Sequence, residues 1–156
     1  MTAAPDIEAA SRAAVVAEAR GWIGTPYHHR GRLKGAGVDC AMFPVEVYAA
    51  LGLMPADIDF GAYPTQWHMH HDEERYLEIV LTYAREIESA PCPGDFVLWQ
   101  FAKTFSHGGI VTEWPRVVHS YIDRGVYEDD ALRSGDFRQK NGKPRPMRAF
   151  TLWGAP

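Results

Sequence analysis

The sequence has few cysteines, no long apolar run and no excess of basic charge. Its 156 residues contain two cysteines, Cys40 and Cys92, which excludes a disulfide framework and favours a reducing compartment. No stretch of about 18 apolar residues occurs, so we expect no membrane-spanning helix. Because the formal net charge is −4, no general electrostatic attraction to nucleic acid or to an anionic membrane is expected.

The first 20 residues also lack the uninterrupted apolar segment that a secretory signal peptide requires. Charged side chains interrupt their apolar stretch, namely Asp6, Glu8, Arg12, Glu18 and Arg20. We therefore expect synthesis in the cytoplasm without a signal peptide, and export by another route if the protein acts outside the cell. Nucleotide binding is not expected, since neither GxGxxG after a strand nor a Walker A sequence occurs.

The composition is that of an ordinary globular chain. Hydrophobic residues make up 46% and charged residues 23% of the sequence, both close to the average for globular domains. One core can hold a chain of this length without covalent staples. We therefore predict a single domain over residues 1–156.

Helical patterns occupy the first half of the chain. Residues 6–22 are rich in alanine and have apolar positions at helical spacing, which predicts a helix. A loop rich in glycine and basic residues follows at 24–39. A second helix is predicted over residues 40–51, with Asp39 as its N-cap. Pro44 lies near its start, and we expect a kink or a loosened first turn there.

The second half changes from a third helix to strands. The third helix has Asp72 as a candidate cap and an apolar stripe made of Tyr76, Leu77, Val80, Leu81, Ala84 and Ile87. Short apolar or alternating runs separated by turn residues then predict a small antiparallel sheet. These runs cover residues 96–101, 108–112, 116–121, 125–128 and 147–153. Helices followed by strands indicate the α+β class.

Cys40 is the first candidate for chemistry. A thiol at a helix N-terminus lies near unpaired N–H groups and the positive end of the helix dipole. Such a position lowers the pKa of a thiol and makes it nucleophilic. The alternative is that Cys40 is a small buried hydrophobic residue, which is the commoner role of a cysteine.

His107 and His119 are the next candidates. His107 lies in the segment SHGGIV, where the glycines are expected to leave open space around a general base. His119 lies in VVHSY, on the next predicted strand. If these strands pair through the turn at 113–116, both rings face one side, provided that the loop has odd length or the strand has a bulge. His119 would then orient His107 as the third member of a Cys–His–X triad. Two unrelated strand histidines are the alternative.

A rival group of histidines is considered for a metal. His68, His70 and His71 lie in WHMHH, and His28 and His29 lie elsewhere. His68 and His70 share one side of an extended chain, which zinc could use. Neither CxxC nor HExxH occurs, so surface or capping histidines are the favoured interpretation and we expect no metal and no organic cofactor. Cys92, between two prolines, is interpreted as a loop thiol.

The order of these segments resembles the NlpC-type family of papain-like cell-wall peptidases. Residues 18 to 122 carry most of the resemblance. Its matching stretches are GWIGTPYHHRG, GAGVDCAMF with a helix ending in ALGL, PGDFVLW, SHGGIV and VVHSY. The family implies a papain-like α+β fold with N-terminal helices packed against a small antiparallel sheet.

The resemblance also implies roles for individual residues. Cys40 is the nucleophile, His107 the general base and acid, and His119 the residue that orients His107. The Tyr27 hydroxyl is implied to lie near the thiol and to help bind the oxyanion. The residues that we expect to contact substrate are Asp39, Ala41, Trp67 and Ser106. The implied reaction is amide hydrolysis through a thioester in a peptidoglycan stem peptide, commonly between D-glutamate and the diamino acid.

The sequence departs from the family pattern in two places. Asp39-Cys40-Ala41-Met42 replaces the usual Asp-Cys-Ser-Gly, which changes the pocket beside the nucleophile. The segment at about 57–90 is longer than in a typical member, and Trp67 with the neighbouring histidines is hypothesised to form a wall or lid of the cleft. These features resemble a branch encoded in prophages beside tail-tip genes, which implies association with phage tail proteins and action in the periplasm or cell wall. A catalytically silent structural tail protein and a Cys–His acyltransferase or amidase remain open alternatives.

Overall fold

The structure of the protein is a computed structural model that describes residues 4–60 and 74–154. Its helices are α1 (Ala4–Gly21), α2 (Met42–Ala50), α4 (Arg75–Tyr83) and the 3-10 helix η1 (Gly135–Phe137). Its strands are β1 (Arg32–Leu33), β2 (Gly37–Val38), β3 (Arg85–Ile87), β4 (Phe96–Phe101), β5 (Thr104–Glu113), β6 (Arg116–Tyr121), β7 (Gly125–Asp130) and β8 (Met147–Thr151). The α+β arrangement with helices first agrees with the sequence prediction.

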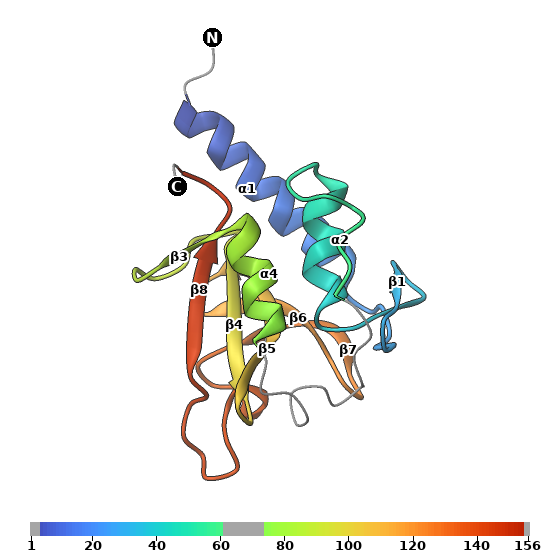
Figure 1. The fold of residues 1–156 in the computed structure, drawn as a ribbon, viewed down its shortest axis with the longest axis vertical. Coiled ribbons are helices and arrows are strands. Elements are labelled where there is room, and N and C mark those ends of the chain that lie inside the picture. The colour runs from blue at the N-terminus through green and yellow to red at the C-terminus, as the bar shows by residue number, and fades with distance from the viewer. Residues whose placement is uncertain (1–3, 61–73, 155–156) are drawn as a thin grey trace.

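A six-stranded sheet forms the body of the structure (Figure 1). Its strand order is β3-β8-β4-β5-β6-β7, and every neighbouring pair is antiparallel. Strands β4 to β7 follow one another by short turns, while β8 returns from the C-terminal region to pair with β4. His107 and His119 lie on the adjacent strands β5 and β6, neither of which is an edge strand of the sheet.

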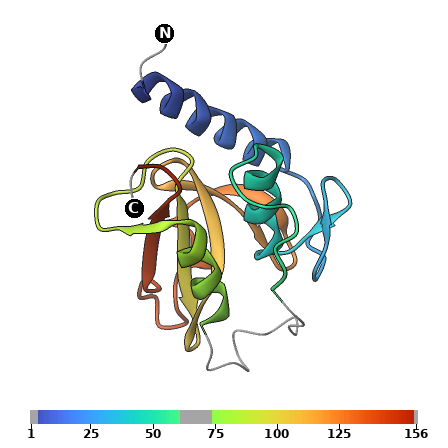
Figure 2. The same cartoon turned by 45° about the horizontal axis from the view of Figure 1, so that its top comes forward.

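The helices α1, α2 and α4 gather over one face of the sheet (Figures 1 and 2). A continuous apolar core joins them to it, with Val15 of α1, Phe43 of α2 and Tyr76 of α4 packed in the same cluster as Phe96 and Ile110 of the sheet. A second, smaller cluster includes Val97, Trp99, Val111, Val117 and Phe137. Within the part of the chain that the structure describes, no helix is both long and apolar enough to cross a membrane.

The segment expected to be a loop at 24–39 contains a small ladder. Strands β1 and β2 pair antiparallel, with Arg32 opposite Val38. Two-residue strands carry too little periodicity to be predicted from sequence. The ladder brings the residues before Cys40 back against the segment at Tyr27, which forms a parallel bridge with Val38.

Helix α2 begins later than the sequence predicts. Cys40 and Ala41 form a turn, and the helix begins at Met42. Pro44 is therefore in the first turn, where its missing N–H would have had no partner within the helix. In place of a loosened first turn of helix, residues 40–41 form a turn that precedes α2.

Helix α4 ends earlier than predicted. Its buried residues are Tyr76, Leu77 and Val80, as the apolar stripe indicated, whereas Leu81 of the same stripe is exposed. Ile87 belongs to β3 and pairs with Ala149 of β8. The backbone turns from helical to extended at Ala84. The candidate cap Asp72 lies outside the described residues, and the residue at the N-cap position is Glu74.

Candidate active site

His107 and His119 form a hydrogen-bonded pair in the interior of the protein. The distance between His107 Nε2 and His119 Nδ1 is 2.8 Å, and the two rings meet edge to face at 85°. His107 is 6% exposed and His119 is fully buried. The structure therefore brings together the two histidines that the sequence predicts as a pair.

A β-bulge puts the two imidazoles on one side of the sheet. Strands β5 and β6 pair Ile110 with Val118 and Val111 with Val117, but the next pair is Glu113 with Arg116. One extra residue on β5 therefore lies between the turn and His107. Successive side chains of a strand point to opposite faces of the sheet. The extra residue therefore reverses the face to which each β5 side chain beyond the bulge points, relative to the side chains of β6. The bulge therefore places both rings on one side, one of the two ways in which the sequence allows His107 and His119 to meet.

Cys40 lies against the backbone of strand β5. Its thiol donates to the carbonyl oxygen of Ser106 over 3.6 Å, which places the sulfur beside the peptide unit that joins Ser106 to His107. On the other side, the Tyr76 hydroxyl donates to the carbonyl oxygen of Cys40 over 3.0 Å. The nucleophile candidate is therefore held between α4 and the strand that carries the candidate base.

Burial raises the pKa of the Cys40 thiol above its ordinary value, and the negative charge of Asp39 raises it further. A backbone hydrogen bond and the Tyr27 hydroxyl act in the opposite direction. This corrects the expectation that the helix N-terminus lowers the pKa of Cys40, since the helix begins two residues later and desolvation is the larger effect. A thiolate at this position therefore needs a neighbouring positive charge to offset the cost of its burial.

Asp39 shapes the turn that carries Cys40. One carboxylate oxygen accepts the N–H groups of Ala41 and Met42 at 3.1 and 2.8 Å, and the other accepts the N–H of Arg30 at 2.8 Å. The residue at the N-cap position is Ala41 and not Asp39 as predicted, but the Asp39 carboxylate still accepts N–H groups at the start of the helix from across the turn. The side chains of Asp39, Ala41 and Ser106 are 1%, 0% and 4% exposed. Their contact with substrate stays a prediction, and their side chains are packed inside the protein.

Tyr27 lies beside the thiol because its segment is tied to the strand before Cys40. Val38 donates to the carbonyl of Pro26, and His28 donates to the carbonyl of Val38. The Ser120 hydroxyl of β6 donates to the same Val38 carbonyl over 2.8 Å. Burial, the Cys40 and Asp39 charges, and a hydrogen bond to Cys40 together raise the pKa of Tyr27. Tyr27 therefore remains a neutral hydrogen-bond donor toward the sulfur.

Aromatic side chains surround the histidine pair. The His107 ring lies 5.3 Å from Phe101 and 5.5 Å from Tyr121, measured between ring centroids. The His119 ring lies 4.6 Å from Tyr127 and 4.8 Å from Phe137. Burial lowers the pKa of His119 to about 3, and the charge of Arg124 lowers it further. His119 is therefore neutral at physiological pH.

Gly108 does not leave open space, contrary to expectation. A Cβ atom at this position would lie 2.4 Å from both the Tyr76 hydroxyl oxygen and a ring carbon of Phe96. The missing side chain allows Tyr76 to approach the strand and reach Cys40. Glycine here thus serves close packing beside the nucleophile.

Trp67, His68, His70 and His71 lie outside the described residues. His29 Nδ1 is 4.0 Å from an Asp39 oxygen, and His28 packs against the backbone near Gly37. Cys92 is exposed, as expected for a loop thiol.

The structure adds residues that the sequence did not indicate. Tyr76 was assigned to an apolar stripe, and nothing in that spacing signalled its hydroxyl contact with Cys40. His119, Asp129 and Asp136 form a group in which one ligand atom of each lies within 4.8 Å of the others. These residue types can hold a divalent cation. No spacing rule joins them, because β6, β7 and η1 each supply one member.

Solved structures of other proteins have the same fold. The NlpC/p60 domain of peptidoglycan hydrolase SagA matches 88% of this chain with a TM-score of 0.57 and 21% identity, and 96% of that domain is covered. NlpC2 and NlpC1 from Trichomonas vaginalis match 90% and 87% of this chain, with TM-scores of 0.62 and 0.57 and identities of 14% and 15%. The chain spans less than half of these two, 45% and 41%. No protein-family model matches the chain, and no curated protein matches it in sequence.

The chain has the NlpC/p60 papain-like α+β fold, in which N-terminal helices pack against a six-stranded antiparallel sheet. This confirms the fold that the sequence resemblance implies. The solved structures also include NlpC/p60 proteins from Bacillus cereus and Staphylococcus aureus, with TM-scores of 0.52 and 0.53.

Proposed function

We propose that the protein is a cysteine peptidase that hydrolyses an amide bond in peptidoglycan stem peptides through a thioester. Cys40 is the nucleophile, His107 the general base and acid, and His119 the residue that orients His107. The observation that carries the proposal is the buried His107–His119 hydrogen bond of 2.8 Å, with the Cys40 thiol bonded to the residue before His107.

The proton path follows from the two nitrogens of His107. Nε2 is engaged by His119 Nδ1, so Nδ1 is the nitrogen that exchanges a proton with the thiol. When Nδ1 takes the proton of Cys40, His107 carries both protons and donates from Nε2 to His119. The imidazolium then stabilises the thiolate beside it, which offsets the cost of burying that charge.

The reaction then proceeds in two halves. The thiolate attacks the amide carbon and the carbonyl oxygen becomes an oxyanion, which accepts hydrogen bonds from the Tyr27 hydroxyl and the Cys40 N–H in this proposal. The C–N bond breaks as the amine takes the proton from His107 Nδ1. Water, deprotonated by His107, then attacks the thioester and releases the free acid and the thiol.

The substrate class is inferred from the fold matches. SagA is a peptidoglycan hydrolase, and this chain covers 96% of its NlpC/p60 domain. We infer a stem peptide as the substrate, and the bond between D-glutamate and the diamino acid as the bond that is cleaved. No cofactor takes part in the proposed chemistry.

Digestion of purified peptidoglycan tests the proposal. The wild type, Cys40→Ala and Cys92→Ala are incubated with sacculi, and released fragments are identified by mass. Cys92→Ala is the matched control, because it removes the exposed thiol and keeps Cys40. We expect stem-peptide fragments from the wild type and Cys92→Ala, and none from Cys40→Ala. Fragments cut in the glycan strand, or equal digestion by Cys40→Ala, would contradict the proposal.

One observation favours a second candidate, a protein that is silent until it is assembled or opened. Cys40 is 9% exposed and its thiol is bonded to a carbonyl oxygen, so the isolated chain gives substrate little access to the sulfur. Iodoacetamide labelling near neutral pH distinguishes the active peptidase from the silent protein. A Cys40 that labels no faster than a buried, unpaired thiol favours the silent protein.

The same Cys–His pair would also support acyl transfer, since the thioester half-reaction is shared. The acceptor separates the two activities. Water gives a free carboxylic acid, whereas an added amine gives a new amide of different mass.

The cellular setting is proposed from the sequence alone. The long segment at about 57–90 and the DCAMF sequence resemble the prophage tail-associated branch. We propose association with phage tail proteins and action in the periplasm or cell wall. Detection of the chain in purified phage particles by mass spectrometry would support this setting, and its absence from particles would oppose it.

A further inference from the structure

One nitrogen of His119 has no partner among the described residues. Nδ1 is bonded to His107, while Nε2 is buried and makes no hydrogen bond within the described part of the chain. The side chain is fully buried. Because an unsatisfied polar atom in the interior costs about 1–3 kcal/mol, its surroundings need an explanation.

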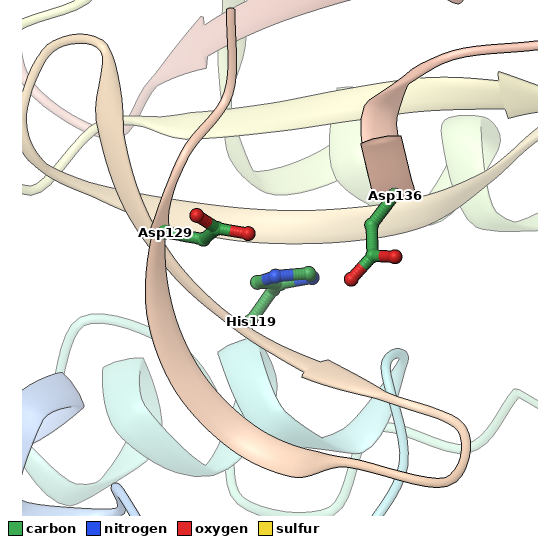
Figure 3. A group of neighbouring side chains, drawn as sticks. All are labelled: His119, Asp129 and Asp136. Atoms are coloured by element: carbon green, nitrogen blue, oxygen red, sulfur yellow. The ribbon is translucent and has the colours of Figure 1, made fainter. Parts of the chain in front are cut away.

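Two carboxylates lie beside this ring. Asp129 belongs to β7 and Asp136 to η1, and one oxygen of each lies within 4.8 Å of the other and of a His119 nitrogen. Figure 3 shows the His119 ring between the two carboxylates. Both aspartates are partly buried.

The tautomer of His119 determines whether the carboxylates face an N–H donor or an unprotonated ring nitrogen at Nε2. Burial keeps His119 neutral, with its pKa lowered to about 3, so the ring carries one proton. When a protonated His107 donates from Nε2, Nδ1 of His119 must accept. The proton of His119 is then on Nε2, so the nitrogen without a partner is an N–H donor.

We propose that Asp129 and Asp136 are positioning residues that accept the Nε2–H of His119, directly or through one water molecule. They extend the triad to a Cys40–His107–His119–carboxylate relay. The inference rests on the proposed function in one respect, the assignment of His107 as the general base. It goes further by assigning a role to two aspartates on separate elements.

The other groups around His119 favour this role over a cation site. The Tyr127 hydroxyl donates to Asp136, and Arg124 Nε lies 3.6 Å from the same carboxylate. Both contacts hold Asp136 in place, and the guanidinium disfavours a nearby metal ion. The remaining rings that face His119 are Tyr121, Phe137 and His107.

The relay has two consequences for the nucleophile. It fixes Nδ1 of His119 as an acceptor, which holds the His107 ring. It also places negative charge on the far side of the histidine pair, which favours the imidazolium form of His107. Loss of both charges would therefore shift the Cys40–His107 pair toward neutral thiol and neutral imidazole.

The test uses full-length Asp129→Asn, Asp136→Asn and the double variant, and measures the pH profile of Cys40 alkylation by iodoacetamide. Asp130→Asn is the matched control, because Asp130 is adjacent but bonds to the N–H groups of Leu132 and Arg133. We expect Cys40 of the double variant to be alkylated about 10- to 100-fold more slowly at pH 7. This is the usual size of the loss when a functional histidine loses the hydrogen-bond partner behind it. Its profile should move to higher pH, with the control unchanged.

Alkylation needs no substrate, so this inference and the proposed substrate fail separately. A wild type that digests no peptidoglycan, while its alkylation depends on the aspartates, would reject the substrate and support the relay. Unchanged profiles in the double variant would overturn the relay, as would a lower melting temperature with an unchanged profile. Alkylation that is abolished by EDTA and restored by zinc would overturn it in favour of a metal site.

Discussion

The Tyr76 hydroxyl donates a 3.0 Å hydrogen bond to the carbonyl oxygen of Cys40. Tyr76 is on α4, inside the segment at about 57–90 that is expected to be longer than in a typical member of the family. Its ring also packs against Phe60 and Phe96, at centroid distances of 5.4 and 5.9 Å. Helix α4 therefore supplies a contact that fixes the backbone of the nucleophile candidate.

Tyr76→Phe should destabilise the protein and reduce turnover. The substitution keeps the ring packing but leaves the buried carbonyl of Cys40 without this donor, which costs about 1–3 kcal/mol of unfolding free energy. Urea denaturation measures the loss, and peptide hydrolysis measures turnover. Tyr83→Phe, at the exposed end of the same helix, is the control and should change neither. Equal stability of the wild type and Tyr76→Phe would contradict the assigned role.

Gly108→Ala should have a related effect from the other side of the contact. The new Cβ would lie 2.4 Å from the Tyr76 hydroxyl oxygen and the Phe96 ring, so both must move. Overpacking of this kind costs about 1–3 kcal/mol, and here it also displaces the donor to Cys40. Thermal unfolding and Cys40 alkylation report the two effects.

Gly135→Ala is the matched control for Gly108→Ala. An added Cβ at Gly135 meets nothing within 4 Å. A Gly108→Ala protein as stable as Gly135→Ala, with unchanged alkylation, would show that Tyr76 tolerates the added methyl group.

Local patterns in the sequence predicted most of the elements. The spans of β4 and β6 match the runs at 96–101 and 116–121, because strand alternation and turn residues are local signals. The ladder of β1 and β2 was missed because two-residue strands depend on contacts with Tyr27 and Ser120. The start of α2 was displaced because the Asp39 side chain caps across a turn.

From the sequence, the candidate site could be predicted only as far as its main residues and not the groups that surround them. From the sequence, His107 and His119 share a face only if the strand has a bulge or the loop has odd length, and the bulge depends on the pairing of β5 with β6. The carboxylates beside His119 come from β7 and η1, and only tertiary folding brings them together. The raised pKa of Cys40 follows from burial, which the position of a residue near a helix start does not reveal.

The free energy of unfolding should fall as the pH is lowered below about 6.5, partly because of His119. Its pKa is about 3 in the folded protein, so the unfolded chain binds one more proton between these values. Stability is therefore fully present above pH 6.5 and decreases by up to about 1.4 kcal/mol per pH unit below it. Denaturation of the wild type and His119→Gln at pH 7.5, 6 and 5 measures this contribution.

His119→Gln should show a flatter dependence on pH, because glutamine does not titrate. The variant is expected to be less stable than the wild type at pH 7.5, with the difference narrowing toward pH 5. Parallel curves for the two proteins would show that His119 is not the group responsible.

Asp39 and Tyr27 should change the reactivity of Cys40 in opposite directions. The Asp39 charge raises the pKa of the thiol, and the Tyr27 hydroxyl lowers it. Asp39→Asn removes the charge while its amide oxygen can still accept the N–H groups of Ala41 and Met42. Its alkylation at pH 7 should be faster than that of the wild type, about tenfold for each unit by which the pKa falls. Cys40 of Tyr27→Phe should be alkylated more slowly than in the wild type, because loss of the Tyr27 hydroxyl raises the pKa of the thiol. The same direction of change in both variants would show that packing around the sulfur, and not charge, controls its reactivity.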